Sequence, residues 1–407
     1  EAAGTGEKVK IGINWWGGDS RHEATMNAIN AFMEENPDIE VEMQYAAWGG
    51  WTEKMGIMLS GNTEPDVMQI NWNWIYMFSK DGNGFYDLNQ LSDIIDIDQF
   101  PDNLIEQMTM DGKLQGIPIS STGKLFLWNK TTFEKAGLDV PASFEDMINA
   151  GQVFQEKLGD DYYPMALTCY EQMLLMIYYL QQKYDKPWIA DQQVNFTQEE
   201  VADGIAWIRM LEDSHVFPSQ AKLAGDGAET MDLNQNWVNG KYAGFLEWDS
   251  SQQKFANALA EGQEMVVGEF PYDYGDTPVD TVKISMAWAI SKNTKHPEEA
   301  ARLVEYLLND ENGVKILGLE RGVVASAKAQ KILEDEGLLS GLTYEGNKAA
   351  MANTSFALDP YFEDSTLKDS TGLYFEIFED LSYDNTDPME LAERLIEGIN
   401  AVQDENK

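Results

Sequence analysis

Residues 9–43 carry the pattern that decides the fold, VKIGINWWGGDSRHEATMNAINAFMEENPDIEVEM. The first five and the last five residues of this stretch have the length and the apolar spacing of strands. Residues 23–35 between them have apolar side chains at helical spacing. A second helix over 52–60 and a third strand over 66–70 follow. This order of strand, helix, strand, helix and strand predicts a parallel sheet joined by right-handed crossovers.

The alternation of strands and helices continues to the end of the chain, with no repeat and no low-complexity linker. Further strands are predicted over 124–128, 163–168, 242–247 and 282–290, and further helices over 144–157, 171–182, 199–212, 297–308 and 389–402. A chain of 407 residues is too long for one hydrophobic core, so we expect two α/β lobes. No run of about eighteen apolar residues is present, so no segment is expected to span a bilayer.

The composition restricts the partners of the protein. The formal net charge is −42, from 70 acidic and 28 basic residues, and such a surface repels nucleic acid and anionic lipid. An anionic ligand would need a local basic pocket. The single cysteine, Cys169, excludes an intrachain disulfide and is expected to be buried. The three histidines lie far apart without metal-ligand spacing, so no metal and no cofactor are expected.

Several short blocks of sequence form a set that is found in one known family. The first lies within 8–67 and contains AFMEENPDI (31–39) and LSGNTEPDV (59–67). The others are LWNK (127–130) with FEKAGL (133–138) and PASF (141–144), NGKYAGF (239–245), and AISK (289–292) with HPEEAA (296–301). Together, and in this order over most of the chain, they resemble the family 1 extracellular solute-binding proteins of bacterial ABC transporters.

The resemblance implies a two-lobed, periplasmic-binding-protein-like α/β fold with an interdomain cleft and three hinge crossovers. The crossovers are expected near 117–121, 282–287 and 321–326, and the lobes are expected to comprise 1–119 with 286–321 and 120–285 with 322–407.

The same resemblance implies a non-catalytic monomer that captures an oligosaccharide between its lobes, outside the cell. It would deliver this ligand to the permease subunits of an ABC importer. The native form is expected to be anchored as a lipoprotein, or to be periplasmic in a bacterium with two membranes. The small and polar residues 1–7 are expected to be a flexible leader.

Six tryptophans follow the first three predicted strands in pairs, and they lead the candidates for ligand contact. Ligands of parallel α/β sheets bind beyond the carboxyl ends of the strands, and aromatic rings stack on the apolar faces of sugars. Gly18 permits close approach of the backbone, while Asp19 and Arg21 offer an acceptor and a donor for hydroxyl groups. The alternative for each tryptophan is a place in the core. The candidates in this half are Trp16, Gly18, Asp19, Arg21, His22, Trp48, Trp51, Asn71, Trp72 and Trp74.

Candidates in the second lobe follow the strands predicted over 163–168 and 242–247. Trp248 is the first choice, because its position is similar to that of the aromatic platform of the family. The acids on either side of it can accept hydroxyl protons, and their alternative is a solvent-facing loop. The candidates are Tyr170, Glu171, Glu247, Trp248 and Asp249. Weaker choices are Asn71 and Trp288, which belong to the first lobe, and Asp359, which belongs to the second.

Two other functions remain open. A glycoside hydrolase or polysaccharide lyase also uses acids and aromatic residues, but the chain lacks Gly-x-Ser-x-Gly and His-Glu-x-x-His motifs and the blocks favour binding. An acidic oligosaccharide such as an oligogalacturonide would need cations near the predicted rim, where only Arg21, His22 and Lys124 are available. A neutral oligosaccharide is therefore the predicted ligand.

Overall fold

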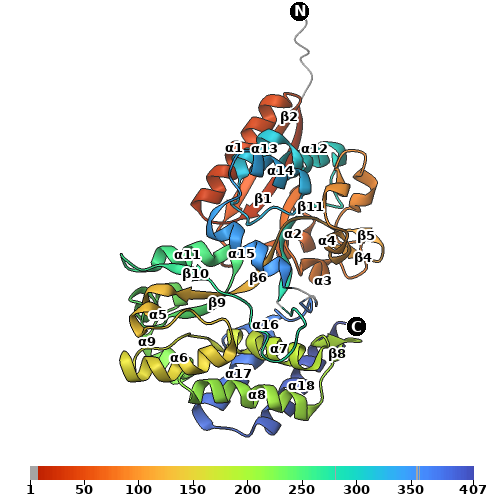
Figure 1. The fold of residues 1–407 in the computed structure, drawn as a ribbon. Coiled ribbons are helices and arrows are strands. Elements are labelled where there is room, and N and C mark those ends of the chain that lie inside the picture. The colour runs from red at the N-terminus through yellow and green to blue at the C-terminus, as the bar shows by residue number, and fades with distance from the viewer. Residues whose placement is uncertain (1–7, 280, 354–355, 357) are drawn as a thin grey trace, which may run out of the picture. The chain divides into compact units, whose positions relative to one another are not determined.

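Two compact units make up the chain in the computed structural model, which describes residues 8–279, 281–353, 356 and 358–407 (Figure 1). The first unit contains the residues up to Thr122 together with Lys283–Gly341, and the second contains Gly123–Val282 together with Leu342–Lys407. The chain passes between the units at 122/123, 282/283 and 341/342, where we expected 119/120, 285/286 and 321/322. The expected leader, 1–7, lies outside the described residues.

The first unit is built on a mixed sheet around β1 (Val9–Trp16). β1 pairs in parallel with β2 (Ile39–Ala46) on one side and with β3 (Val67–Asn71) on the other. The predicted parallel sheet is therefore confirmed for these three strands. β11 (Val282–Ile290) pairs antiparallel with β3. This pairing was not expected, because the sequence of a strand that returns from a distant segment does not indicate its direction.

Helices of the first unit pack through narrow apolar faces. α1 (Asp19–Glu35) buries Ala28, Ile29 and Phe32, which recur on one side of the helix. It packs against α13 (Glu311–Leu317) and α12 (Pro297–Asn309), as Figure 1 shows beside β1. The unit also contains α2 (Trp51–Gly61), α3 (Trp74–Phe78), η1 (Leu88–Leu91), η2 (Ile97–Gln99), α4 (Asp102–Gln107), β4 (Thr109–Met110), β5 (Lys113–Leu114) and α14 (Ala327–Asp335).

The second unit is organised around α7 (Cys169–Tyr184), which is buried on all sides as expected of a core helix. α8 (Gln198–Asp213) and α17 (Leu373–Asp384) pack against it, and α18 (Pro388–Glu405) packs against both of these (Figure 1). Cys169 is buried, as predicted, and burial raises the pKa of its thiol. Although α7 is rich in apolar residues, no helix in the described part of the chain is long and apolar enough to cross a membrane.

A small antiparallel sheet completes the second unit. β6 (Ile117–Asn129) starts in the first unit and pairs with β9 (Gly244–Trp248) and β10 (Met265–Val267) in the second. The unit also contains α5 (Lys130–Ala136), α6 (Phe144–Lys157), β7 (Ile189–Ala190), β8 (Gln193–Val194), α9 (Gln220–Asp226), η3 (Met231–Leu233), α10 (Gln235–Val238), η4 (Asp249–Ser251), α11 (Gln252–Ala258), α15 (Gly341–Ala352) and α16 (Ser365–Lys368).

The strand predicted over 163–168 is wrong. This segment forms an isolated bridge at Tyr163 and no strand. Pro164 has no N–H to donate to a ladder, and the next two residues donate their N–H groups to two separate places, Val216 and Gly244. Because these hydrogen bonds diverge, no regular pairing develops. The other predicted strands and helices are confirmed, with shifted ends and with a longer β6 than expected.

Candidate functional site

A buried lysine in the second unit collects several of the predicted binding residues. Lys124, on β6, is 2% exposed. Its Nζ lies 3.6 Å from Oε1 of Glu171 and 3.7 Å from Oε1 of Glu247, and it donates a hydrogen bond of 3.3 Å to a carbonyl oxygen of β9. It also lies 5.3 Å from the ring centre of Tyr170 and 4.8 Å from that of Trp248. These five side chains are called the Lys124 cluster below.

Strand register and a helix start bring these side chains together. In the pairing of β6 with β9, Lys124 lies opposite Trp248, and the next residue of β6 lies opposite Glu247. Tyr170 and Glu171 occupy the first turn of α7, where an acid is favoured by the helix dipole. The prediction that these two residues follow a strand was therefore wrong.

The Lys124 cluster holds two carboxylates for one ammonium group. Burial raises the pKa of Glu247, and attraction by Lys124 opposes this rise. Glu247 accepts the N–H of Trp248 at 2.6 Å, and Glu171 accepts the hydroxyl of Thr168. Because a carboxylate accepts several hydrogen bonds, both acids retain acceptor positions for sugar hydroxyls. The partly exposed ring of Trp248 lies beside them.

Asp249 has a different environment from its neighbours in sequence. It is fully buried, and its Oδ1 accepts the N–H of Gly123 at 2.8 Å. Its Oδ2 accepts a hydrogen bond of 2.7 Å from the side chain of Asn347 on α15. These two bonds tie β6 to α15, and a ligand-binding role for Asp249 stays a prediction.

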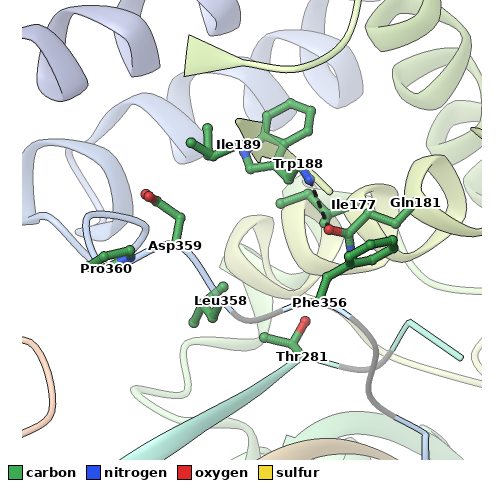
Figure 2. Close-up of a pocket in the computed structure, with 9 residues that line it drawn as sticks. All are labelled: Ile177, Gln181, Trp188, Ile189, Thr281, Phe356, Leu358, Asp359 and Pro360. Atoms are coloured by element: carbon green, nitrogen blue, oxygen red, sulfur yellow. Dashed lines mark hydrogen bonds between the residues drawn. The ribbon is translucent and has the colours of Figure 1, made fainter. Parts of the chain in front are cut away.

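Asp359 lines a separate cavity of about 200 Å³ in the second unit, among mainly apolar side chains (Figure 2). Burial raises the pKa of its carboxyl to about 6. The carboxyl accepts hydrogen bonds from the side chain of Gln403 at 2.8 Å and from the N–H of Tyr361 at 3.2 Å. Thr281, on the wall of this cavity, accepts the N–H of Lys124 at 3.1 Å. The cavity therefore adjoins the backbone of the strand that carries the Lys124 cluster.

Tryptophans from three strand ends meet in the first unit. The ring centre of Trp16, at the end of β1, lies 4.9 Å from that of Trp48 and 5.5 Å from that of Trp74. Trp48 and Trp74, which follow β2 and β3, stack at 6.4 Å. Trp16 and Trp74 are buried, whereas Trp48 is 47% exposed. Of these three rings, called the tryptophan group below, Trp48 is the one that is open to a ligand.

The other candidate tryptophans of this unit are covered by protein. Trp51, Trp72 and Trp288 are all buried. Nζ of Lys54 lies 4.9 Å from the ring centre of Trp51, and Nζ of Lys283 lies 5.4 Å from that of Trp72. These positions suit core packing, and a binding role for the three residues stays a prediction.

Two arginines are connected to the tryptophan group through the carbonyl oxygen of Trp16. This oxygen accepts hydrogen bonds of 3.2 Å from Nη1 of Arg21 and from Nε2 of Gln69. Oε1 of Gln69 accepts Nε of Arg321 at 2.7 Å, and the guanidinium of Arg321 lies 5.1 Å from the ring centre of Trp288. Gln69 and Arg321 were not among the predicted site residues. They are 252 residues apart in sequence, so no local pattern marks their contact.

The remaining candidates lie at the start of α1 and at the end of β3. Gly18 caps α1 and Asp19 begins it, and both are exposed. Nδ1 of His22 accepts the indole N–H of Trp15 at 3.0 Å, and burial lowers the pKa of this histidine. The side chain of Asn71 donates to a nearby asparagine at 2.8 Å. Binding roles for these four candidates stay predictions.

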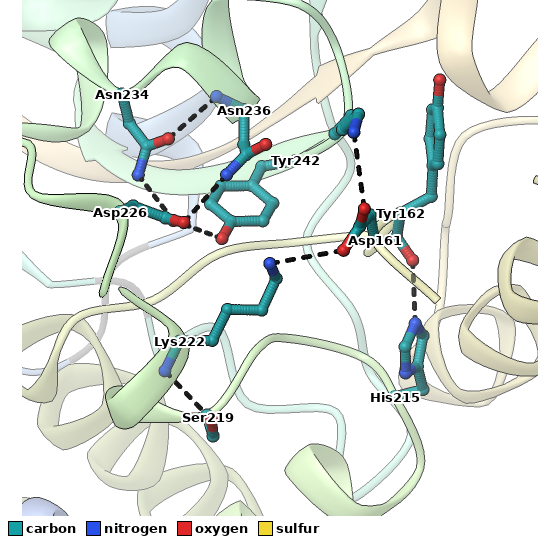
Figure 3. A network of polar contacts seen from close by, with 10 residues as sticks. Asp161, Tyr162, His215, Ser219, Lys222, Asp226, Asn234, Asn236 and Tyr242 are labelled. Carbon is teal, nitrogen blue, oxygen red and sulfur yellow. Dashed lines mark hydrogen bonds and ion pairs between the residues drawn. The ribbon is translucent and has the colours of Figure 1, made fainter. Parts of the chain in front are cut away.

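A polar network elsewhere in the second unit has a structural role (Figure 3). Asp161 pairs with Lys222 and with Lys241, at 3.5 Å in each case. Asp226, at the end of α9, accepts hydrogen bonds from two asparagines and from Tyr242. Protein donors already satisfy both acids. Their ion pairs and hydrogen bonds connect α9 with the residues that precede β9. Within the described residues, no group of three or more histidine, cysteine, aspartate or glutamate side chains is arranged to hold a metal ion.

Comparisons with known proteins match the chain to one family and to solved structures. A family model described as bacterial extracellular solute-binding protein matches residues 18–314. A periplasmic solute-binding protein of Pectobacterium atrosepticum is 36% identical, with a TM-score of 0.91 over 98% of this chain and 99% of that one. A periplasmic oligogalacturonide-binding protein of Yersinia enterocolitica, solved with saturated digalacturonic acid, is 34% identical, with a TM-score of 0.88 over 98% of this chain and 100% of that one.

The curated relatives are more distant. An uncharacterized extracellular-binding protein of an ABC transporter from Pyrococcus horikoshii is 22% identical over 79% of this chain and 73% of its own length. A putative binding protein of Brucella abortus is 28% identical over 34% of this chain, and the match spans only 33% of that protein.

Proposed function

Because the chain belongs to the bacterial extracellular solute-binding proteins, we propose that it captures an acidic oligosaccharide of the oligogalacturonide class outside the cell. It then passes this ligand, uncleaved, to the permease of an ABC importer. Membership in this family was predicted from the sequence and is confirmed. The matched periplasmic proteins also confirm the predicted α/β fold class of two-lobed solute-binding proteins. Capture of the ligand between the lobes stays a prediction.

One observation carries the choice of ligand class: the match to the oligogalacturonide-binding protein of Yersinia enterocolitica. It extends over nearly the full length of both chains at 34% identity. The two arginines beside the tryptophan group support the same choice, because arginine is the usual partner of a carboxylate.

A neutral oligosaccharide, the ligand predicted from the sequence, is the second candidate. The Lys124 cluster supports it, because two carboxylates for one ammonium suit hydroxyl groups better than a further anion. An acidic oligosaccharide also carries hydroxyl groups, so this cluster is compatible with both ligands.

The carboxylate pair of Glu171 and Glu247 also bears on the enzyme alternative. Glycoside hydrolases use two carboxylates, one of which has a raised pKa, and burial raises the pKa of Glu247. Both acids, however, form ion pairs with Lys124, and the family to which the chain belongs binds solutes. We therefore propose binding without cleavage. Chromatography of an incubated oligosaccharide mixture should return every component intact, and the appearance of shorter products would contradict this proposal.

Titration calorimetry with defined sugars tests the ligand class. We expect digalacturonate and trigalacturonate to bind and the matching neutral galactose oligosaccharides to bind far more weakly. Affinity for the acids should fall as salt rises from about 0.01 M to 1 M, because the Debye length shrinks from about 30 Å to about 3 Å. Binding of neutral sugars alone, with no dependence on salt, would exclude the acidic class and restore the neutral one.

The lipid anchor and the monomeric state are further parts of the proposal. Radiolabelled fatty acid should be incorporated into the native protein in its own bacterium, and sedimentation velocity should give one species near the mass of a single chain. Absence of the label, or a dimer at micromolar concentration, would contradict the respective part.

A further inference from the structure

Arg321 is a buried cation with most of its donors unused. The side chain is 5% exposed, and its Nε donates to Gln69. Its Nη1 and Nη2 have no hydrogen-bond partner among the residues that the structure describes. A buried charge is costly unless it is paired and hydrogen-bonded. The donors on these two nitrogens are therefore available to a group that is not part of the described protein.

A second cation lies close to the first. Burial lowers the pKa of Arg321 well below its usual range, and repulsion by Arg21 lowers it further. Arg21 donates to the carbonyl oxygens of Trp16 and Glu320, which are neutral acceptors. The partly exposed carboxylate of Glu320 attracts both arginines, and it also accepts the hydroxyl of Ser20 at 3.0 Å. Two guanidinium groups therefore share one carboxylate, which leaves an excess of positive charge.

Water alone cannot compensate this charge. A cavity of about 20 Å³ that Arg321 lines has mainly apolar walls, among them Leu307 and Val314, so a water there would have few other hydrogen-bond partners. Such a water can accept a hydrogen bond from the guanidinium, but it carries no negative charge. An anion would satisfy both the donors and the charge.

We propose that Arg321, together with the neighbouring Arg21, binds one carboxylate group of the ligand. This binding site lies in the first unit and is called the seat below. This inference rests on the proposed function, because it assumes an acidic sugar. A carboxylate matches the planar fork of a guanidinium through two parallel hydrogen bonds. Trp16 contacts Arg21 through its carbonyl oxygen and the exposed Trp48 through its ring. The seat therefore adjoins an aromatic surface that suits the sugar ring itself.

The seat predicts which chemical change in the ligand matters most. A methyl ester removes the negative charge of the carboxylate and adds a methyl group where the buried guanidinium requires an acceptor. We expect the wild-type protein to prefer digalacturonate over its methyl ester, and this preference should depend on Arg321.

Substitutions at two arginines of the same unit separate the seat from a general effect of charge. Arg321→Met should lower the affinity for digalacturonate by about 30-fold or more, as the loss of a buried anchoring arginine does. Arg302→Met removes the same charge from a surface pair with Asp38 at 3.1 Å, and it should change the affinity by less than about twofold. Arg321→Lys keeps the charge but not the fork, so its loss should be intermediate. Unliganded Arg321→Met should melt no lower than the wild type, because it removes an uncompensated buried charge.

Calorimetry with digalacturonate and its methyl ester distinguishes the possible failures. A wild-type protein that binds no acidic oligosaccharide overturns the proposed function. A wild type that binds, with full affinity retained in folded Arg321→Met, overturns the seat and leaves the proposed function standing. If Arg321→Met does not fold, Arg321→Lys and Arg21→Met carry the test. Each should reduce the preference for the acid over its ester, and an unchanged preference in both overturns the seat.

Discussion

Removal of the Lys124 ammonium is the sharpest perturbation of the second unit. Lys124→Met keeps most of the apolar stem and deletes the charge that lies 3.6 Å from Glu171 and 3.7 Å from Glu247. At an effective dielectric constant of about 20, unit charges about 4 Å apart attract by about 4 kcal/mol. Two such attractions offset the cost of burying the ammonium, so their sum is not a net gain. Removing one partner leaves the other charges uncompensated, and we expect a loss of about 3–5 kcal/mol in the free energy of unfolding at pH 7.

The loss should depend on pH with a defined sign. Burial already raises the pKa of Glu247, and without Lys124 this pKa should rise further. A carboxyl with a raised folded pKa stabilises the fold below its unfolded value of about 4.3, and this contribution disappears as pH rises through the folded pKa. The difference between wild type and Lys124→Met should therefore be largest at neutral pH and shrink on acidification.

Urea unfolding at pH 7 and at about pH 4.5 measures both quantities. Lys124→Met/Glu247→Gln should recover part of the loss, because it removes both members of one pair. Lys130→Met breaks an exposed pair with Glu264 at 3.2 Å, and as a control it should cost less than about 1 kcal/mol. A loss below about 1 kcal/mol for Lys124→Met at pH 7, or an equal loss at both pH values, would refute the view that this ammonium compensates the two carboxylates.

Three other predictions concern single side chains. Trp248→Ala should weaken sugar binding about thirtyfold with little change in melting temperature, and a collapsed melting temperature would show a core residue instead. Asp359→Asn should stabilise the protein at pH 8 and have little effect near pH 4. Burial raises the pKa of this carboxyl from 3.8 to about 6, so the stability that it contributes at low pH is lost as pH rises through about 6. At about 1.4 kcal/mol per pKa unit, the gain measured by urea unfolding is at most about 3 kcal/mol, and equal stability at both pH values would contradict the burial. The thiol of Cys169 should resist a thiol reagent in the folded protein and react once urea unfolds it, whereas rapid labelling of the folded protein would contradict its buried position.

Local sequence patterns were sufficient for the parallel part of the first unit. The apolar spacing of β1, β2 and α1 predicted these elements, because one buried face repeats at a fixed interval along each of them. The rule that ligands bind at strand ends also identified Trp16, Trp48 and Trp74, which meet in one group. The sequence could not indicate that Trp48 is exposed and Trp74 covered, since coverage depends on residues far away in the chain.

Contacts between distant segments account for what the sequence did not predict. Arg321 reaches Gln69 across 252 residues, and Lys124 reaches a carbonyl oxygen of β9 across 122 residues. Neither arginine nor lysine belongs to a periodic pattern or a local motif at these positions, so the sequence does not indicate these contacts. The segment 163–168 misled the prediction for a related reason. Its apolar residues suit a strand, but its backbone N–H groups donate to two separate places, a loop at Val216 and the start of β9 at Gly244.

The burial of α7 on all sides has a consequence for the geometry of the Lys124 cluster. Apolar packing fixes the rotation of a helix only through the fit of side-chain shapes, whereas hydrogen bonds also have a preferred direction. Two buried glutamines near its last turn supply a direction. Gln181 accepts a backbone N–H at 3.0 Å, the bond drawn in Figure 2, and Gln182 donates to a backbone carbonyl at 2.9 Å. Since Glu171 lies in the first turn of the same helix, hydrogen bonds about three turns away contribute, with the local bond from Thr168, to the angle at which this carboxylate meets Lys124.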